Sequence, residues 1–210
     1  MDYLEIGNRK IGKLFKPLII AEIGINHEGD INKAKKMVDD AISAGCECIK
    51  FQSHILDKEM IPNKVIPGNS KDSIWDIIKR CSLTFDEEKK LKSYVEKKGK
   101  IFLSTPFSKE AAFNLNKLGV CAFKIGSGEC NNLPLIEYIL KFKKPILLST
   151  GMNNISMIEK SVKLIQKKKI PFILMHCVSI YPTPYEKASI TAVKQLKKKF
   201  KTDLVGLSDH

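Results

Sequence analysis

Seven short apolar runs recur along this 210-residue chain, each of strand length and each separated from the next by a longer segment. Most of the runs, such as KPLIIAEIGI and KKPILLSTG, are apolar at consecutive positions and not at alternate ones. Strands of a parallel sheet have this pattern because both of their faces are buried. The runs predict seven parallel strands, at roughly 18–23, 47–52, 100–104, 121–126, 145–149, 171–177 and 203–207.

The segments between the runs have the period of amphipathic helices. Apolar residues from Ile31 to Ile42 recur on one helical stripe, and Gly45 stands where that helix is expected to stop. Polar residues that favour helix starts precede the other periodic segments. We expect these helices to start at Asp86, at Ser108, at a capping box Ser156-x-x-Glu159 and near Ile190.

Strand and helix alternate nearly throughout, which predicts an α/β fold, a (β/α)8 TIM barrel. Since seven strands are counted, the barrel is expected to be incomplete by one strand. Residues 1–16 predict a hairpin around Gly7-Asn8 that closes the bottom of the barrel, and residues 17–210 predict the partial barrel domain. Residues 53–85 form an unusually long connection, which indicates a lid or a substrate loop.

Polar or ionisable side chains follow each of the seven runs. Because active sites of parallel barrels lie at the carboxyl ends of the strands, these tips predict one ligand site built from many short pieces. The tips are Glu22; Lys50 and Gln52; Ser104 and Thr105; Lys124 and Ser127; Ser149 and Thr150; His176; and Ser208, Asp209 and His210.

Two of these tips, Lys50 and Lys124, are lysines inside apolar runs, where an unpaired ammonium is unfavourable. Together with nearby hydroxyl groups they suit a ligand that carries phosphate and carboxylate. The alternative is that each lysine pairs with a carboxylate of the barrel, such as Glu22 or Glu129. The turns after residues 125 and 148 can also present backbone N–H groups to an anion, whereas the absence of GxGxxG disfavours a dinucleotide fold.

Composition narrows the class of protein further. At 210 residues and 43% hydrophobic residues, the chain is long enough for one domain with a real core. No apolar run has the length of a membrane span, and the first residues lack the apolar core of a signal peptide, so we expect a cytoplasmic protein without a membrane partner. The six cysteines form no C-x-x-C pair, which favours buried thiols over disulfides or a zinc site.

The formal net charge of +13 raises the hypothesis of nucleic-acid binding. However, the lysines stand in scattered pairs and triplets such as Lys35-Lys36 and Lys197-Lys198-Lys199, without interleaved aromatic residues. Solvated helix faces are therefore the favoured interpretation, and nucleic acid is not expected as a partner. The excess positive charge can still attract an anionic substrate.

Seven motifs stand in order along the chain: IIAEIGINHEGD (19–30), IKFQ (49–52), LSTPF (103–107), FKIGSGECNN (123–132), LSTGM (148–152), LMHCVSIYPTPYE (174–186) and GLSDH (206–210). Taken together, these motifs resemble the sialic acid synthase family and, within it, the bacterial N-acetylneuraminate synthases. The similarity runs from about residue 17 to the last residue, with the motifs in order. VIPGNSKDSIWDIIKRCSL (65–83) resembles the sialic-acid branch more than the pseudaminic-acid branch, while legionaminic acid synthases stay an alternative.

The resemblance implies condensation of phosphoenolpyruvate with N-acetylmannosamine and water, which gives N-acetylneuraminate and phosphate. It also implies a divalent metal, Mn²⁺ or Mg²⁺, and a homodimer for the complete enzyme. By motif position it assigns phosphoenolpyruvate to Lys50, Thr105, Lys124, Ser127 and Ser208. It places the sugar against Glu22, Gln52 and Tyr181, with Glu22 moving a proton or holding water. It makes His210 one of two histidine ligands of the metal.

Plain structural roles compete for the remaining histidines: a loop or turn for His27 and His54, and a hydrogen-bonded core position for His176. At one position the chain departs from the family, since Ser179 stands where many members have an asparagine that contacts phosphoenolpyruvate.

The family's later barrel residues, with the second metal histidine and an acidic residue, are not found in this sequence, nor is the antifreeze-like domain that donates an arginine. We therefore expect a fragment that binds phosphoenolpyruvate but has little or no synthase activity by itself. Unpaired edge strands would make such a fragment prone to aggregation. The rivals are an inactive remnant without a ligand, and a barrel enzyme that condenses phosphoenolpyruvate with a sugar phosphate.

Overall fold

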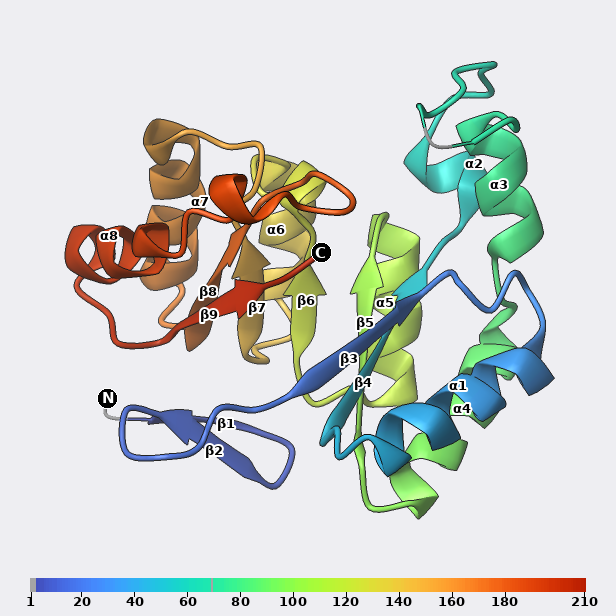
Figure 1. Cartoon of the computed structure of the whole chain (residues 1–210), viewed down its shortest axis with the longest axis horizontal. Coiled ribbons are helices and arrows are strands. Elements are labelled where there is room, and N and C mark those ends of the chain that lie inside the picture. Colours follow the sequence, from blue (N-terminus) through green and yellow to red (C-terminus); the bar gives the residue numbers. More distant parts are fainter. Residues whose placement is uncertain (1–2, 69) are drawn as a thin grey trace. The chain divides into compact units, whose positions relative to one another are not determined.

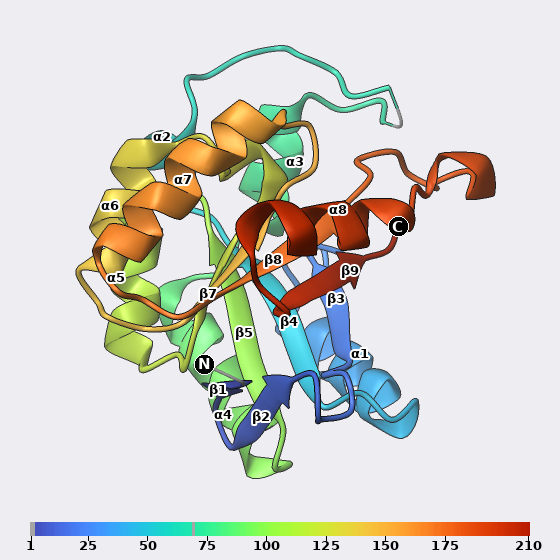
Figure 2. The ribbon, with the colours of Figure 1, turned by 90° about the vertical axis from the view of Figure 1, so that its left-hand side faces the viewer.

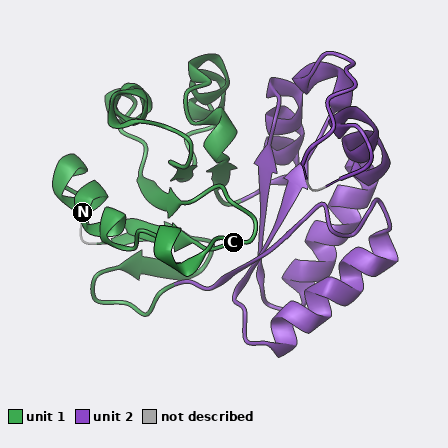
Figure 3. Ribbon diagram, turned by 45° about the horizontal axis from the view of Figure 1, so that its top comes forward, with its two compact units in different colours: residues 1–17, 121–210 green, residues 18–120 purple. Residues whose placement is uncertain are grey.

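A computed structural model describes residues 3–68 and 70–210. The first two residues of the expected hairpin segment and Asn69 of the 65–83 motif lie outside this range. The chain divides into two compact units, one made of residues 18–120 and the other of residues 1–17 with 121–210 (Figure 3).

Residues 18–120 form a three-stranded parallel sheet in the order β3-β4-β5. Its strands are β3 (Ile20–Gly24), β4 (Cys48–Ser53) and β5 (Ile101–Pro106). The helices are α1 (Ile31–Ser43), α2 (Leu56–Glu59), α3 (Ile74–Cys81), α4 (Phe85–Lys97) and α5 (Lys109–Leu118). Helix α1 packs against α4 and β3, while α4 and α5 pack against β5 (Figure 1).

The other unit holds a four-stranded parallel sheet in the order β6-β7-β8-β9. Its strands are β6 (Phe123–Ile125), β7 (Ile146–Ser149), β8 (Phe172–Cys177) and β9 (Val205–Ser208). The helices are α6 (Leu133–Leu140), α7 (Ile155–Lys167) and α8 (Thr191–Phe200), with single 3₁₀ turns at Ser127–Glu129 and Tyr185–Lys187. Helices α6 and α7 pack together, and α8 packs against β8 and β9 (Figure 2).

The N-terminal hairpin, β1 (Tyr3–Ile6) with β2 (Arg9–Gly12), is antiparallel as expected. Leu4 and Ile6 are buried. Tyr3, Leu4 and Leu14 line a hollow of about 750 Å³ with Phe172 and Leu204, which stand at the amino ends of β8 and β9. The hairpin therefore lies at the end of this sheet opposite to the polar strand tips.

All seven predicted parallel strands are present, within two residues of their expected starts. Apolar side chains from consecutive strand positions are buried, for example Ile146, Leu147 and Leu148 in β7. This burial on both faces is the reason that the continuous apolar runs predicted a parallel sheet. The α/β fold class is confirmed.

The helix starts expected from the sequence agree with the structure at α1 and α5 and differ from it at α7. The Asp30 side chain caps α1 by accepting from the backbone N–H groups of Asn32 and Lys33. Ser108 caps α5 in the same way. The expected capping box at Ser156 is wrong, because Asn154 Oδ1 accepts from Met157 N–H at 3.0 Å and starts α7 earlier.

None of the six cysteines, all of which lie in the described range, forms a disulfide, and Cys48, Cys81, Cys130 and Cys177 are buried, as the sequence favoured. Cys46 and Cys121 are half-buried. Within the described range, no helix has the length and apolar character needed to span a membrane.

Candidate active site

The carboxyl ends of β3, β4 and β5 bring four of the predicted site residues together. The parallel register sets Glu22 beside Lys50 and Gln52 beside Thr105. Lys50 Nζ forms an ion pair with Glu22 Oε2, so the expected alternative of a lysine paired with a carboxylate holds at this position. The Glu22 side chain keeps 40% of its surface exposed, whereas that of Lys50 keeps 12%. A ligand can therefore reach the carboxylate from solvent while the lysine holds it in place.

The side chain of Gln52 contacts His54, for which the sequence favoured an ordinary place in a loop or turn. His54 Nε2 lies 3.0 Å from Gln52 Oε1, and His54 Nδ1 lies 2.8 Å from Glu59 Oε1. Both the His54 and Glu59 side chains are 4% exposed. His54 also stacks on Phe107, with ring centroids 4.4 Å apart. These contacts make His54 a buried structural partner of a candidate site residue.

Gly24 leaves room at the same strand ends. Its φ of +57° is in the left-handed region, and a Cβ there would stand 3.2 Å from Glu22 Oε1 and 3.5 Å from Gln52 Nε2. A side chain at this position would therefore be strained and would press on both polar groups. The glycine keeps the space beside Glu22 and Gln52 open.

In the second unit, Lys124 is the buried cation of the predicted anion site. Its Nζ donates to Ser149 Oγ at 2.6 Å and to the Ile125 carbonyl at 3.1 Å. Burial lowers the pKa of Lys124 to about 8, because desolvation disfavours the ammonium. The suggested carboxylate partner, Glu129, instead accepts a hydrogen bond from Asn132. Lys124 is thus held by neutral groups, and a bound anion would be a favourable neighbour for it.

The turn after β7 lies next to the turn after β6, the strand that carries Lys124. A Cβ on Gly151 would stand 2.7 Å from Ser179 Oγ, 2.8 Å from Ser127 Oγ and 3.0 Å from the Cys177 carbonyl. The two hydroxyl groups therefore converge on the backbone of Gly151. Asn153 Nδ2 donates to the carbonyls of Ser127 and Gly151, at 2.8 and 2.6 Å, and so ties the two turns together. Neither the contacts of Asn153 nor the contact between Lys124 and Ser149 was predicted from the sequence. A side chain that bridges two loops leaves no periodic pattern.

Tyr181, Ser208 and His210 gather at the ends of β8 and β9. The ring of Tyr181 lies 4.4 Å from that of His210, centroid to centroid. His210 Nε2 lies 3.2 Å from Ser208 Oγ and 3.3 Å from Cys177 Sγ. Tyr181 is 62% exposed, so one face of this group of residues is open to solvent.

The remaining histidines have structural surroundings. His176 is buried and lies 3.0 Å from the Ala188 carbonyl, as expected for a core histidine. His27 is buried in the turn after β3, where its Nδ1 accepts from Gly29 N–H. Burial lowers the pKa of His27, because desolvation disfavours the charged imidazolium.

The predicted metal site is not complete among the described residues. Within residues 3–68 and 70–210, no three His, Cys, Asp or Glu side chains gather closely enough to hold a metal ion. His210 offers one imidazole nitrogen, with the Cys177 thiol beside it. A divalent metal needs more protein ligands than these two side chains supply, so they do not fit one by themselves.

With this geometry established, comparison with known proteins identifies the family. The NeuB family model matches residues 37–210. The chain belongs to the NeuB family. A solved relative is the N-acetylneuraminic acid (sialic acid) synthetase of Leptospira borgpetersenii serovar Hardjo-bovis in complex with citrate. That structure superposes with a TM-score of 0.89 at 35% identity, over 99% of this chain and 70% of its own.

Two NeuB-family relatives show how the members differ. The N,N'-diacetyllegionaminic acid synthase of Campylobacter jejuni is 39% identical over 204 residues, which are 93% of this chain and 61% of that protein. The N-acetylneuraminate-9-phosphate synthase of Drosophila melanogaster is 32% identical over 206 residues, or 95% of this chain and 55% of that protein. The chain thus spans less than two thirds of the length of these relatives. The fold is that of the NeuB-family synthases.

Proposed function

We propose that this NeuB-family chain carries the phosphoenolpyruvate subsite and part of the sugar subsite of an N-acetylneuraminate synthase. The overall reaction joins phosphoenolpyruvate, N-acetylmannosamine and water and releases phosphate. The observation that carries the proposal is Lys124, a buried ammonium whose hydrogen bonds within the described residues go to neutral groups, beside converging serine hydroxyls. Such a cation in a poorly solvated place is stabilised by an anionic ligand.

The anion side of the proposal uses residues of the β6–β9 sheet. Two of the three Lys124 N–H groups bond to Ser149 and Ile125, which leaves the third for a phosphate or carboxylate oxygen. Ser127 and Ser179 add hydroxyl donors at the Gly151 turn, and Ser208 adds one at the end of β9. Ser179 is shorter than the asparagine of many family members, but its hydroxyl lies next to the Gly151 backbone. We propose that it donates to phosphoenolpyruvate in place of the amide.

The sugar side of the proposal uses Glu22, Gln52 and Tyr181, and Lys50 and Thr105 keep the phosphoenolpyruvate contacts that the resemblance implies. In the reaction, the enol carbon of phosphoenolpyruvate bonds to the sugar aldehyde carbon. Water adds to the carbon that bears the phosphate, and C–O cleavage then releases phosphate. In this proposal Glu22, half-exposed and anchored by Lys50, accepts a proton from that water or from a sugar hydroxyl.

A divalent metal, Mn²⁺ or Mg²⁺, would polarise the aldehyde when bound. We propose His210 as one of its ligands. Within residues 3–68 and 70–210 no cluster of three possible ligands surrounds a common point, so the steps above are assigned only to side chains that this chain supplies.

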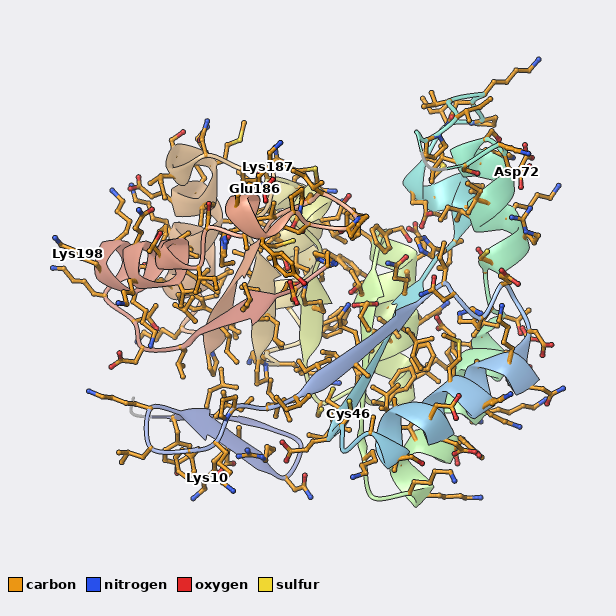
Figure 4. All side chains as sticks on the ribbon, in the orientation of Figure 1. Lys10, Cys46, Asp72, Glu186, Lys187 and Lys198 are labelled. Carbon is orange, nitrogen blue, oxygen red and sulfur yellow. The ribbon has the colours of Figure 1, made fainter. Side chains whose placement is uncertain are left out.

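Binding of phosphoenolpyruvate to the chain tests the proposal directly. Titration calorimetry is expected to give saturable heat with the wild type and none with Lys124→Met, which removes the ammonium but keeps an apolar stem of similar length. The control is Lys198→Met, on the exposed side of α8 (Figure 4), which should bind as the wild type does. A folded wild type without binding heat would favour the rival of a remnant without ligand function.

The nature of the acylated sugar is a second question, because a legionaminic acid synthase is 39% identical to the chain. We propose N-acetylmannosamine as the acceptor. With phosphoenolpyruvate present, N-acetylmannosamine is expected to bind more tightly than a 2,4-diacetamido sugar or N-acetylmannosamine 6-phosphate. The reverse order would favour the legionaminic or the sugar-phosphate alternative, respectively.

A further inference from the structure

A buried hydrogen-bond network joins Gln52, His54 and Glu59 at the end of β4. Gln52 Oε1, His54 Nε2, His54 Nδ1 and Glu59 Oε1 follow one another with separations of 3.0 Å and 2.8 Å across the two contacts. Glu59 Oε2 is buried and accepts no hydrogen bond within the described residues. An unsatisfied carboxylate oxygen is costly in a protein interior. The network is therefore retained at some expense to stability.

The protons of this network determine which end of the Gln52 amide faces outward. A carbonyl oxygen cannot donate, so His54 Nε2 carries a proton and donates it to Gln52 Oε1. His54 Nδ1 and Glu59 Oε1 share one further proton between them. With its oxygen held inward, Gln52 must present its NH2 group at the opposite end.

The surroundings of Gln52 agree with this orientation. Gln52 Nε2 and Glu22 Oε1 lie within 3.5 and 3.2 Å of one point, the place where a Cβ on Gly24 would stand. A carboxylate that borders the same space favours an amide N–H group there over an amide oxygen. Both ends of the amide therefore have matching neighbours in the same orientation.

The ring of His54 is itself held in place. It stacks on Phe107 with an angle of 12° between the two planes, and its side chain is 4% exposed. His54 directly follows β4 and Phe107 directly follows β5, so the stacking joins the segments after two neighbouring strands. A rigid ring fixes the direction of its Nε2–H bond.

We propose that His54, oriented by Glu59, is a positioning residue that locks the Gln52 amide with its NH2 group toward the acceptor sugar. This inference rests on the proposed function for the identity of the sugar. His54 acts through Gln52 and touches no substrate. A sugar hydroxyl or acyl oxygen would accept the hydrogen bond from the Gln52 NH2 group.

Two substitutions at His54 separate the hydrogen bond from the ring. His54→Phe keeps an aromatic ring on Phe107 but has no N–H group, while His54→Gln replaces the ring by an amide that can donate at the Nε2 position. Loss of an oriented hydrogen bond is expected to weaken sugar affinity about fivefold in His54→Phe. In His54→Gln most of that affinity should return, and phosphoenolpyruvate affinity should not change in either variant.

Substitutions at Glu59 give a second matched pair. Glu59→Gln still offers Nδ1 a partner, and Glu59→Met offers none. The first should bind sugar nearly as the wild type does, and the second should resemble His54→Phe. Tyr94→Phe is the control for loss of a hydrogen bond elsewhere in the unit, because Tyr94 donates to Asp39 Oδ2 at 2.7 Å between α4 and α1.

The measurements are titration calorimetry with each ligand, and the ¹⁵N–¹H signals of the Gln52 side-chain amide, which need no substrate. We expect those signals to move toward the position of a free amide in His54→Phe and Glu59→Met, and to stay near the wild-type position in the other variants. Unchanged amide signals in a folded His54→Phe variant would overturn the inference, as would equal sugar affinities in His54→Phe and wild type. If the wild type binds no sugar at all, the proposed function fails on its own, and the amide signals alone decide the role of His54.

Discussion

Burial shifts the pKa values of Lys124 and Glu88 in opposite directions. It lowers the pKa of Lys124 to about 8 and raises that of Glu88 to about 7. The cause is the same for both groups, since a poorly solvated place disfavours whichever form carries the charge. Lys124 stands among the candidate site residues, whereas Glu88, on α4, bonds to Ser53 at the end of β4. The consequences for binding and for stability can therefore be measured separately.

For Lys124 we expect phosphoenolpyruvate affinity to depend on pH. The bound anion stabilises the ammonium and raises its pKa, so binding above about pH 8 must take up a proton. Affinity should be constant just below pH 8 and fall by up to tenfold per pH unit above it. Calorimetry in buffers of different ionisation enthalpy measures the proton uptake. An affinity that stays flat up to about pH 9.5 would contradict a role for the Lys124 ammonium.

For Glu88 the expectation concerns stability. Its folded pKa of about 7 lies above the ordinary value of 4.5, so the folded state binds more protons between these values. Stability therefore falls as pH rises from 4.5 to about 7. Glu88→Gln removes the ionisation and should gain about 3 kcal/mol relative to wild type between pH 4.5 and pH 8.

Urea unfolding at those two pH values checks the Glu88 prediction. Glu96→Gln is the control on the same helix, because the Glu96 side chain is 49% exposed and its ion pair with Lys92 is a surface contact. If Glu88→Gln and wild type show the same change in unfolding free energy with pH, burial does not act on Glu88 in this way.

At the scale of elements, the turns after β6 and β7 depend on a glycine that has no room for a side chain. Gly151→Ala would bring a methyl group within 3.0 Å of the Cys177 carbonyl and closer still to Ser127 and Ser179. We expect the hydroxyls to be pushed apart and phosphoenolpyruvate affinity to fall at least tenfold, since overpacking costs about 1–3 kcal/mol. Gly128→Ala is the matched control, because nothing lies within 4 Å of its Cβ position. Calorimetry that finds both variants equal to wild type would refute this account of the turns.

The strands and most helix starts could be predicted from sequence, because their causes are local. Continuous apolar runs follow from burial on both faces, and the Asp30 and Ser108 caps bond within three residues of themselves. Helix α6 was missed for the opposite reason. Its sequence LPLIEYIL is apolar on nearly every side, so no helical stripe marks it. At α7 two candidate caps compete, and Asn154 takes the position that the Ser156-x-x-Glu159 spacing had indicated.

The strands that carry the candidate residues were predictable from sequence, and the contacts of these residues were not. Glu22, Lys50, Lys124 and Ser208 lie in β3, β4, β6 and β9, each within or next to the apolar run that predicted its strand. The contacts of Asn153 with two turns and the contact of Lys124 with Ser149 arise only once separate segments are folded together. Even the His54 contacts, though close in sequence, depend on how the loop after β4 folds.

At the scale of the whole molecule, the formal net charge of +13 is the dominant electrostatic feature. Long-range attraction of a multiply charged anion is screened as the Debye length falls from about 30 Å at 0.01 M salt to about 8 Å at 0.15 M. We expect the association rate of phosphoenolpyruvate to fall severalfold over this range. The neutral N-acetylmannosamine should show no such dependence, and stopped-flow binding measures both. Equal salt dependence for the two ligands would contradict electrostatic steering.

The division of the chain into units has a consequence for the order of events during synthesis on the ribosome. Residues 18–120 are continuous, so that unit can fold as soon as it has left the exit tunnel. The hairpin is made first, yet Leu4 is buried in a unit whose other members are residues 121–210. The nascent hairpin must therefore wait, with its apolar side chains exposed, until β8 and β9 have been made. Closing so long a loop makes this a slow step in the folding of the chain.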